Sequence, residues 1–164
     1  MAARGIVTIF ILNLCLVPIF SQTDQLDFLA AHNVARAVSG VPALQWDDTV
    51  AAHAIAFARQ QQDTAGCGIA HSPSSPYGEN IFSGQGKNYT ASDAVNSWVA
   101  AKQFYDYPTN SCSRPGQCGT YTQVVWKDTT KLGCGVGFCP AGTTSTFIIC
   151  NYSPAGNFNG ERPF

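Results

Sequence analysis

The chain has 164 residues, and 45% of them are hydrophobic. A chain of this length predicts one domain with a buried core. Its formal net charge of −1 excludes both the basic surplus of a nucleic-acid-binding protein and the charge excess of a disordered chain.

Residues 1–21 have the pattern of a secretory signal peptide. Arg4 is followed by the apolar run Ile6–Leu16, and the small residue Ser21 ends the segment. This order is typical of a cleaved signal, and the run is too short to cross a bilayer. We expect cleavage after Ser21, a single mature domain over residues 22–164 and secretion to the extracellular space. An uncleaved anchor or a buried core helix is the alternative.

The cysteines fit an oxidising compartment. The chain has seven, and removal of residues 1–21 takes away Cys15 and leaves an even number. An even set in a secreted chain indicates a disulfide framework. A zinc site is the alternative, but the sequence has no CxxC pair and only three histidines that could complete a cysteine site. Spacing alone favours only the short loop between Cys112 and Cys118.

Three segments have helical periodicity. Apolar residues recur every three to four positions over Asp24–Ala37 and Asp48–Gln62, and a third helix begins at Ser92. Asp47 and Ser92 are the side chains expected to cap the second and third helices. Between these two helices, residues 67–88 are rich in Gly, Pro and Ser and predict a loop that contains one short strand.

β-branched and aromatic residues dominate after Pro115. Three short runs separated by turn residues predict strands over Tyr121–Trp126, Leu132–Phe138 and Thr146–Tyr152. Helices followed by hairpin-linked strands predict an α+β domain.

His71 and Glu79 are the polar residues best suited to form a site. They lie close together in the loop after Cys67, and an imidazole with a carboxylate can bind a divalent metal or relay a proton. Two ligands make a weak metal site, because stable zinc sites use three or four. The alternative is that Glu79 accepts backbone N–H groups and holds the loop together. The sequence also has no GxSxG, P-loop, HExxH or paired-carboxylate motif, so we expect no enzyme, no metal and no cofactor.

Two other segments are candidates for function. Phe104, Tyr105 and Tyr107 follow the third helix, and adjacent rings on a loop can bind an apolar ligand or a lipid. The alternative for these rings is packing of the loop on the core. Asn88 begins an N-x-S/T sequon in an expected loop and is a candidate glycosylation site. The sequon at Asn151 falls in an expected strand and is discounted.

The stretch Gly119–Trp126 (GTYTQVVW) resembles a signature of the CAP superfamily, which includes the plant pathogenesis-related class-one proteins. Three further stretches agree with that family in order and spacing: His32–Arg36 (HNVAR), Gly78–Ile81 (GENI) and Cys150–Asn157 (CNYSPAGN). The mature cysteines are in matching places, so the resemblance covers nearly the whole mature chain.

The resemblance implies a three-layer α-β-α sandwich with a central antiparallel sheet. It also implies three disulfides, Cys67–Cys139, Cys112–Cys118 and Cys134–Cys150. Many family members bind a metal in a central cleft with two His and two Glu. His71 and Glu79 match one of each, but the other two positions are Ala101 and Thr120, so we expect metal to bind poorly here.

The functions that the resemblance implies do not require the His and Glu metal ligands of the central cleft. Some members bind sterol at an aromatic loop that matches Phe104, Tyr105 and Tyr107, and plant members can release a C-terminal defence peptide that matches Pro154–Phe164. We therefore expect a monomeric, non-enzymatic defence protein of the extracellular space (apoplast), with sterol or another lipid as its partner. A precursor of a signalling peptide with its own receptor is the first alternative, and a metal-dependent hydrolase is the second.

Overall fold

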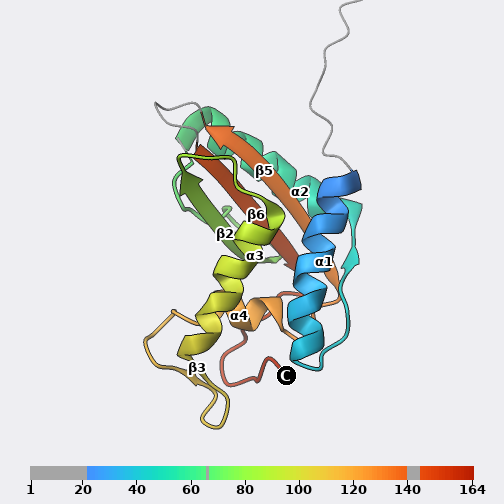
Figure 1. Ribbon diagram of the computed structural model, residues 1–164, viewed down its shortest axis with the longest axis vertical. Coiled ribbons are helices and arrows are strands. Elements are labelled where there is room, and N and C mark those ends of the chain that lie inside the picture. The colour runs from blue at the N-terminus through green and yellow to red at the C-terminus, as the bar shows by residue number, and fades with distance from the viewer. Residues whose placement is uncertain (1–21, 66, 140–144) are drawn as a thin grey trace, which may run out of the picture.

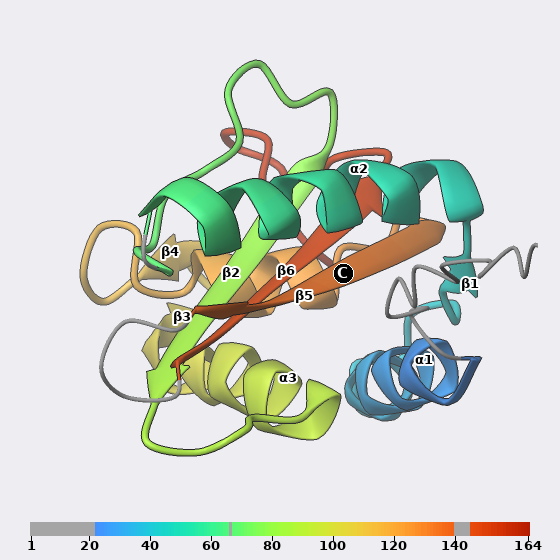
Figure 2. The ribbon, with the colours of Figure 1, turned by 90° about the horizontal axis from the view of Figure 1, so that it is seen from above.

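The computed structural model describes residues 22–65, 67–139 and 145–164, so the predicted signal peptide lies outside the described residues. Within them, a sheet lies between two helical layers. α2 (Asp48–Gln60) covers one face, and α1 (Gln22–Val38) and α3 (Ala91–Ala100) lie side by side over the other (Figure 1, Figure 2). This arrangement is the predicted α-β-α sandwich. The described part of the chain contains no helix that is long and apolar enough to cross a membrane.

α2 and α3 both begin at a side-chain cap. Asp47 accepts hydrogen bonds from two backbone N–H groups of the first turn of α2, both at 3.0 Å, as predicted. The cap of α3 is Thr90 and not Ser92, which lies inside the first turn. Thr90 Oγ1 accepts from Asp93 N at 3.2 Å, and Asp93 Oδ2 accepts from Thr90 N at 2.8 Å. Ser92 could not form this reciprocal pair, because the residue three positions later is Val95.

The predicted strand Tyr121–Trp126 is wrong, because the chain forms a short helix there, α4 (Gly119–Val124). Every residue of the predicted strand is buried, so the segment has no solvent-facing side to impose an alternating pattern. A short apolar run of this kind is compatible with a buried helix as well as with a strand. Packing against α3 and α1 therefore overrides the β propensity of the individual residues.

The sheet has four strands in the order β1-β5-β6-β2. The three long strands, β2 (Gly78–Gln85), β5 (Lys131–Cys139) and β6 (Ser145–Ser153), pair antiparallel, as predicted, and β6 lies between the other two. β1 (Gln45–Trp46) pairs parallel to β5, so the sheet as a whole is mixed and not purely antiparallel. A strand of two residues is too short to produce a sequence pattern, so it was not predicted.

α2 lies directly on the backbone of β5. Gly133, Gly135 and Gly137 alternate along the strand and face this helix. A Cβ added at Gly133 would lie 2.0 Å from the backbone N of Ala51, and one added at Gly135 would lie 2.6 Å from the backbone of Ala54. Any side chain at these positions would push the helix away, so the glycines fix a short distance between helix and sheet.

The three disulfides that the resemblance implies are present, Cys67–Cys139, Cys112–Cys118 and Cys134–Cys150. Cys134–Cys150 joins paired positions of β5 and β6 in the main hydrophobic core. Cys67–Cys139 joins the loop after α2 to the end of β5, over a sequence separation of 72 residues. It is buried in a second hydrophobic cluster with Phe57 and Phe147, between α2 and the sheet.

Candidate functional site

His71 and Glu79 lie together at the start of β2, as the sequence predicts. His71 Nδ1 is 3.2 Å from Glu79 Oε2, and the side chain of His71 is 72% exposed whereas that of Glu79 is 4% exposed. Ser72 binds the carboxylate with two groups: its backbone N–H donates to Oε2 at 3.0 Å, and its hydroxyl donates to Oε1. Both carboxylate oxygens of Glu79 therefore hold the loop, which favours the structural alternative for this residue.

The other two cleft positions offer no metal ligand. Ala101 has only a buried methyl group, and Thr120 Oγ1 donates to the backbone O of Trp98 at 3.3 Å. Among residues 22–65, 67–139 and 145–164, no group of three or more His, Cys, Asp or Glu side chains could hold a metal ion. The carboxylate of Glu79 is already bound to Ser72. The residues present therefore do not fit the metal site that the resemblance implies.

A buried chain of hydrogen bonds joins α1, the sheet and α4. His32 Nδ1 lies 2.8 Å from Phe28 O, and His32 Nε2 lies 2.8 Å from Tyr152 Oη. Asn80 Nδ2 donates to Tyr152 Oη at 3.1 Å and to Thr120 O at 2.9 Å. Because a carbonyl only accepts, we assign the ring proton of His32 to Nδ1, which leaves Nε2 to accept from the Tyr152 hydroxyl.

Burial keeps both rings of this chain neutral. It lowers the pKa of His32 to about 4, with a further lowering by the charge of Arg36. Burial also raises the pKa of Tyr152 above its ordinary value. The sequence reasoning used His32 only as part of a family stretch and missed this network. The available clue was that His32 follows Phe28 by four positions, which places a polar ring on the buried face of α1.

Arg36 is fully buried and is satisfied by backbone carbonyl groups. Its Nε donates to Pro42 O at 2.6 Å, and its Nη1 donates to Val124 O and Trp126 O, both at 2.9 Å. Its Nη2 donates to Thr129 O at 3.0 Å. Burial lowers the pKa of Arg36 to about 10, so the guanidinium stays charged at neutral pH. Arg36 therefore ties α1 to the C-terminal end of α4, where a cation is electrostatically favoured.

The predicted aromatic loop is divided between core and surface. A 3-10 turn (Ala101–Phe104) leads into a small antiparallel pair, β3 (Tyr105–Asp106) and β4 (Ser111–Cys112). Phe104 and Tyr105 pack against the main core. Of the three aromatic residues only Tyr107 is exposed, with 46% of the residue accessible to solvent. Phe104 and Tyr105 therefore fit the alternative of packing on the core. Tyr107 is the one residue of the three whose exposure is compatible with binding an apolar ligand.

The C-terminal tail (residues 154–164) ends on this loop. The ring of Phe164 stacks on that of Tyr107, with centroids 5.0 Å apart and an angle of 14° between the planes. Phe164 also meets Tyr105 and Tyr121 edge-on, at 6.2 and 6.4 Å. The guanidinium of Arg162 lies 5.0 Å from the Tyr107 ring centroid and donates to the Tyr107 carbonyl. The structure thus brings together the aromatic loop and the peptide segment, which the sequence reasoning treated separately.

The two sequons differ in exposure. Asn88 is exposed in the loop between β2 and α3, so glycosylation there stays a prediction. Asn151 is fully buried in β6, and its Nδ2 donates to His53 Nδ1 at 2.7 Å. The burial of Asn151 therefore agrees with discounting its sequon.

The family model of the cysteine-rich secretory proteins (CAP) matches residues 29–152. The chain is 45% identical over 144 residues to the pathogenesis-related protein PR-1 of Medicago truncatula, a match that covers 88% of this chain and 81% of the relative. It is 41% identical over 159 residues to the pathogenesis-related protein 1 of Arabidopsis thaliana, with coverages of 97% and 94%.

Solved structures share the fold. The crystal structure of NaASP2 with Zn2+ matches with a TM-score of 0.70 at 25% identity, over 88% of this chain and 86% of that one. The crystal structure of MpPR-1i matches with a TM-score of 0.62 at 21% identity, over 84% and 91%. The match to the family model ends before the tail.

Proposed function

Because this chain belongs to the cysteine-rich secretory protein (CAP) family, and the relatives above are pathogenesis-related proteins, we propose that it is a secreted defence protein that binds sterol or another lipid and catalyses no reaction. The signal-like pattern of residues 1–21 supports export from the cell. The three disulfides support an oxidising destination.

The observation that carries the lipid-binding proposal is the exposed ring of Tyr107. The residue is 46% exposed, and its ring contacts those of Tyr105 and Phe164. An aromatic face buries well against an apolar ligand, and the phenol hydroxyl tolerates water at the edge of the contact. Such binding gains about 25 cal/mol per Å² of apolar surface that it buries, and it needs no ionisable group.

The C-terminal tail occupies the Tyr107 ring that a lipid would contact. Phe164 stacks on Tyr107, so a ligand that stacks on that face must displace the end of the tail. Residues 157–162 are exposed, but the tail is held near both ends of this stretch: Asn157 Nδ2 donates to Gly119 O at 2.9 Å, and Lys127 N donates to Pro163 O at 2.7 Å. We therefore propose that lipid binding at Tyr107 is coupled to the position of the tail, and that loss of the Phe164 ring raises affinity.

Binding of the fluorescent sterol dehydroergosterol to the mature protein (residues 22–164) tests this proposal. Tyr107→Ala should weaken binding about tenfold, equivalent to about 1.4 kcal/mol. The control is Leu26→Ala, which removes an exposed apolar side chain (65% exposed) from α1 and should bind as the wild type does. Phe164→Ala should bind several-fold more tightly than the wild type. Wild-type affinity in the Tyr107→Ala variant would refute the loop assignment.

A second candidate function is that of a peptide precursor. The exposure of Pro154 favours it, because release of the peptide requires a protease to cleave the bond before this residue. Mass spectrometry of extracellular fluid from wounded tissue that expresses the protein tests this idea. Detection of the free peptide Pro154–Phe164 would support it, and repeated recovery of only the intact chain would count against it.

A metal-dependent hydrolase is the candidate with the least support. Glu79 is bound by Ser72, and Ala101 replaces the second carboxylate that the family pattern expects. We expect calorimetric titration with Zn2+ to give no binding in the low micromolar range. Binding of that strength, lost in a Glu79→Gln variant, would show that the remaining pair does form a metal site.

A further inference from the structure

A cavity at the open edge of β5 shares no lining residue with the aromatic loop. Its volume is about 470 Å³, and its walls come from the first turns of α1, the second half of α2 with the turn that follows it, the residues that lead into α3 and the end of β5. β1 pairs only with Lys131 and Leu132, so within the described residues β5 has no strand neighbour beyond them on this side. Pockets that bury small ligands have volumes of roughly 300–1,000 Å³. The cavity is therefore large enough for one small amphiphile.

The walls of this β5-edge cavity are largely apolar. The apolar lining residues are Phe28, Ile55, Tyr89, Ala91, Val136 and Phe138. Phe28 is 1% exposed and Phe138 is 51% exposed, so the apolar lining runs from the core to the surface. An apolar chain that entered the cavity would remove the exposed part of this lining from water, which is favourable.

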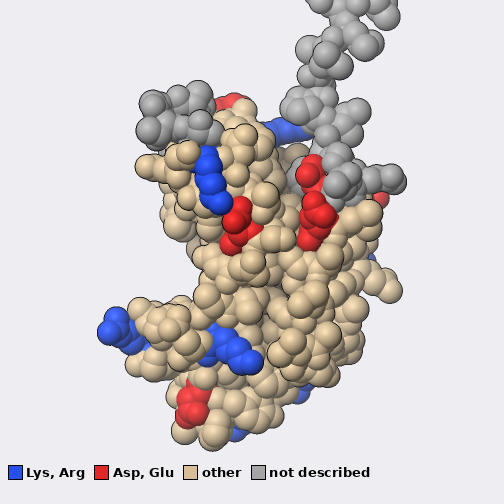
Figure 3. Space-filling model, in the orientation of Figure 1, with Lys and Arg blue, Asp and Glu red and all other residues tan. Residues whose placement is uncertain are grey.

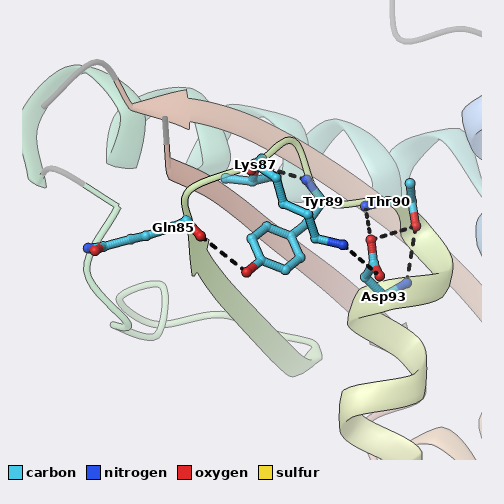
Figure 4. A network of polar contacts seen from close by, with 6 residues as sticks. Gln85, Lys87, Tyr89, Thr90 and Asp93 are labelled. Atoms are coloured by element: carbon cyan, nitrogen blue, oxygen red, sulfur yellow. Dashed lines mark hydrogen bonds and ion pairs between the residues drawn. The ribbon is translucent and has the colours of Figure 1, made fainter. Parts of the chain in front are cut away.

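The wall beside α3 is held in place without a ligand. Tyr89 Oη donates to Gln85 O at 3.2 Å (Figure 4). The ring of Tyr89 also meets that of Phe82 edge-on, with centroids 5.0 Å apart. Lys87 Nζ lies 4.7 Å from the centroid of the Tyr89 ring and 3.5 Å from Asp93 Oδ1. The ring position is thus fixed from several sides, and the charge of Lys87 is paired with a carboxylate. A preformed wall lowers the ordering cost of binding.

The polar part of the lining is acidic. It contains the carboxylates of Asp24, Asp27 and Asp63 and one cation, Arg59. Acidic side chains gather at the N-terminal end of α1 on the face shown in Figure 3. All three carboxylates belong to exposed residues, so each contributes only modestly to binding of a cation. Together they favour a positive head group and disfavour a negative one.

We propose that the β5-edge cavity binds an amphiphile with one apolar chain and a cationic amine head group. The chain lies against Tyr89, Val136 and Phe138, and the amine lies among the carboxylates. This site is independent of the lipid contact proposed at Tyr107, because the two surfaces have no residue in common.

The test compares three probes of equal chain length on the mature protein: decylamine, decanol and decanoate. Calorimetry below the micelle concentrations of the probes should show decylamine binding about tenfold more tightly than decanoate, with decanol between them. Because exposed charges are screened by salt, the difference should shrink at about 0.15 M salt. Equal affinity for the amine and the carboxylate, or no binding of decylamine, would overturn the proposal.

Variants separate the cavity from non-specific charge effects. Asp24→Asn with Asp27→Asn should remove the preference for the amine. The control pair Asp48→Asn with Asp128→Asn changes the net charge equally outside the cavity and should keep the preference. Ala91→Phe fills part of the cavity and should weaken the binding of all three probes. If the preference survives in the first pair, or if Ala91→Phe binds decylamine as the wild type does, the assignment is wrong. Tyr107→Ala should leave decylamine binding unchanged.

Discussion

Acid should destabilise the protein through His32 before it acts on the carboxylates. Burial, with a smaller effect from the Arg36 charge, holds the pKa of His32 at about 4 in the folded protein, against 6.5 for an ordinary histidine. Between these values the unfolded chain takes up a proton that the native state excludes, so the free energy of unfolding falls as pH falls. Each pH unit between the two pKa values lowers the free energy of unfolding by about 1.36 kcal/mol. Protonation of His32 over the whole interval therefore costs about 3 kcal/mol of stability.

Urea unfolding at a series of pH values from about 7 to about 4.5 measures this loss, because the free energy of unfolding extrapolates linearly with urea. His32→Gln keeps a polar side chain but cannot titrate, so it should be less stable at neutral pH and should lose less stability toward pH 4.5. The control His71→Gln changes an exposed ring (72%) and retains His32, so it should show the full loss.

The carboxylates act in a separate pH window. A hydrogen bond from Lys131 lowers the pKa of Asp47, and hydrogen bonds from Thr90 lower that of Asp93. Stability from these groups is present above the ordinary value of 3.8 and is lost only as pH falls below it. A His32→Gln variant with the same pH dependence as the wild type from about pH 6.5 to about pH 4.5 would refute the assignment to this ring.

Three further predictions concern the glycine contact, the buried arginine and the cap of α3, and urea unfolding tests each of them. Gly133→Ala should cost about 2 kcal/mol or more, because its Cβ would overlap the backbone of α2, whereas Gly119→Ala, with its nearest contact at 3.8 Å, should cost less. Arg36→Met should cost about 3 kcal/mol or more, because it leaves buried carbonyl groups without donors. Thr90→Ala should cost about 1 kcal/mol by loss of the helix cap, and Ser92→Ala should stay within about 0.5 kcal/mol. Equal effects at positions 90 and 92 would contradict the cap assignment.

Sequence reasoning succeeded where the cause of a structure lies within a few residues. The cap at Asp47 and the strands over Leu132–Phe138 and Thr146–Tyr152 follow from local chemistry and local pattern. It failed at Tyr121–Trp126, where burial on all sides removes the pattern that distinguishes a helix from a strand. It also missed Thr90, because a reciprocal cap depends on the pair and not on one residue.

The candidate site follows the same rule. His71 and Glu79 are eight residues apart, and their contact was predictable from the loop between them. His32 and Tyr152 are 120 residues apart, and no local pattern connects them. The contact of Phe164 with Tyr107 likewise depends on how the whole sandwich folds, so it becomes visible only in the structure.

The packing of Phe164 against Tyr107 affects how recombinant protein should be prepared. Its ring is the last of the chain and packs against Tyr107, so an affinity tag fused after it would emerge directly beside the proposed lipid contact. An extension before Gln22 would start next to Asp24, at the rim of the β5-edge cavity. Material freed of fusions at both termini is therefore the appropriate sample for measuring either ligand.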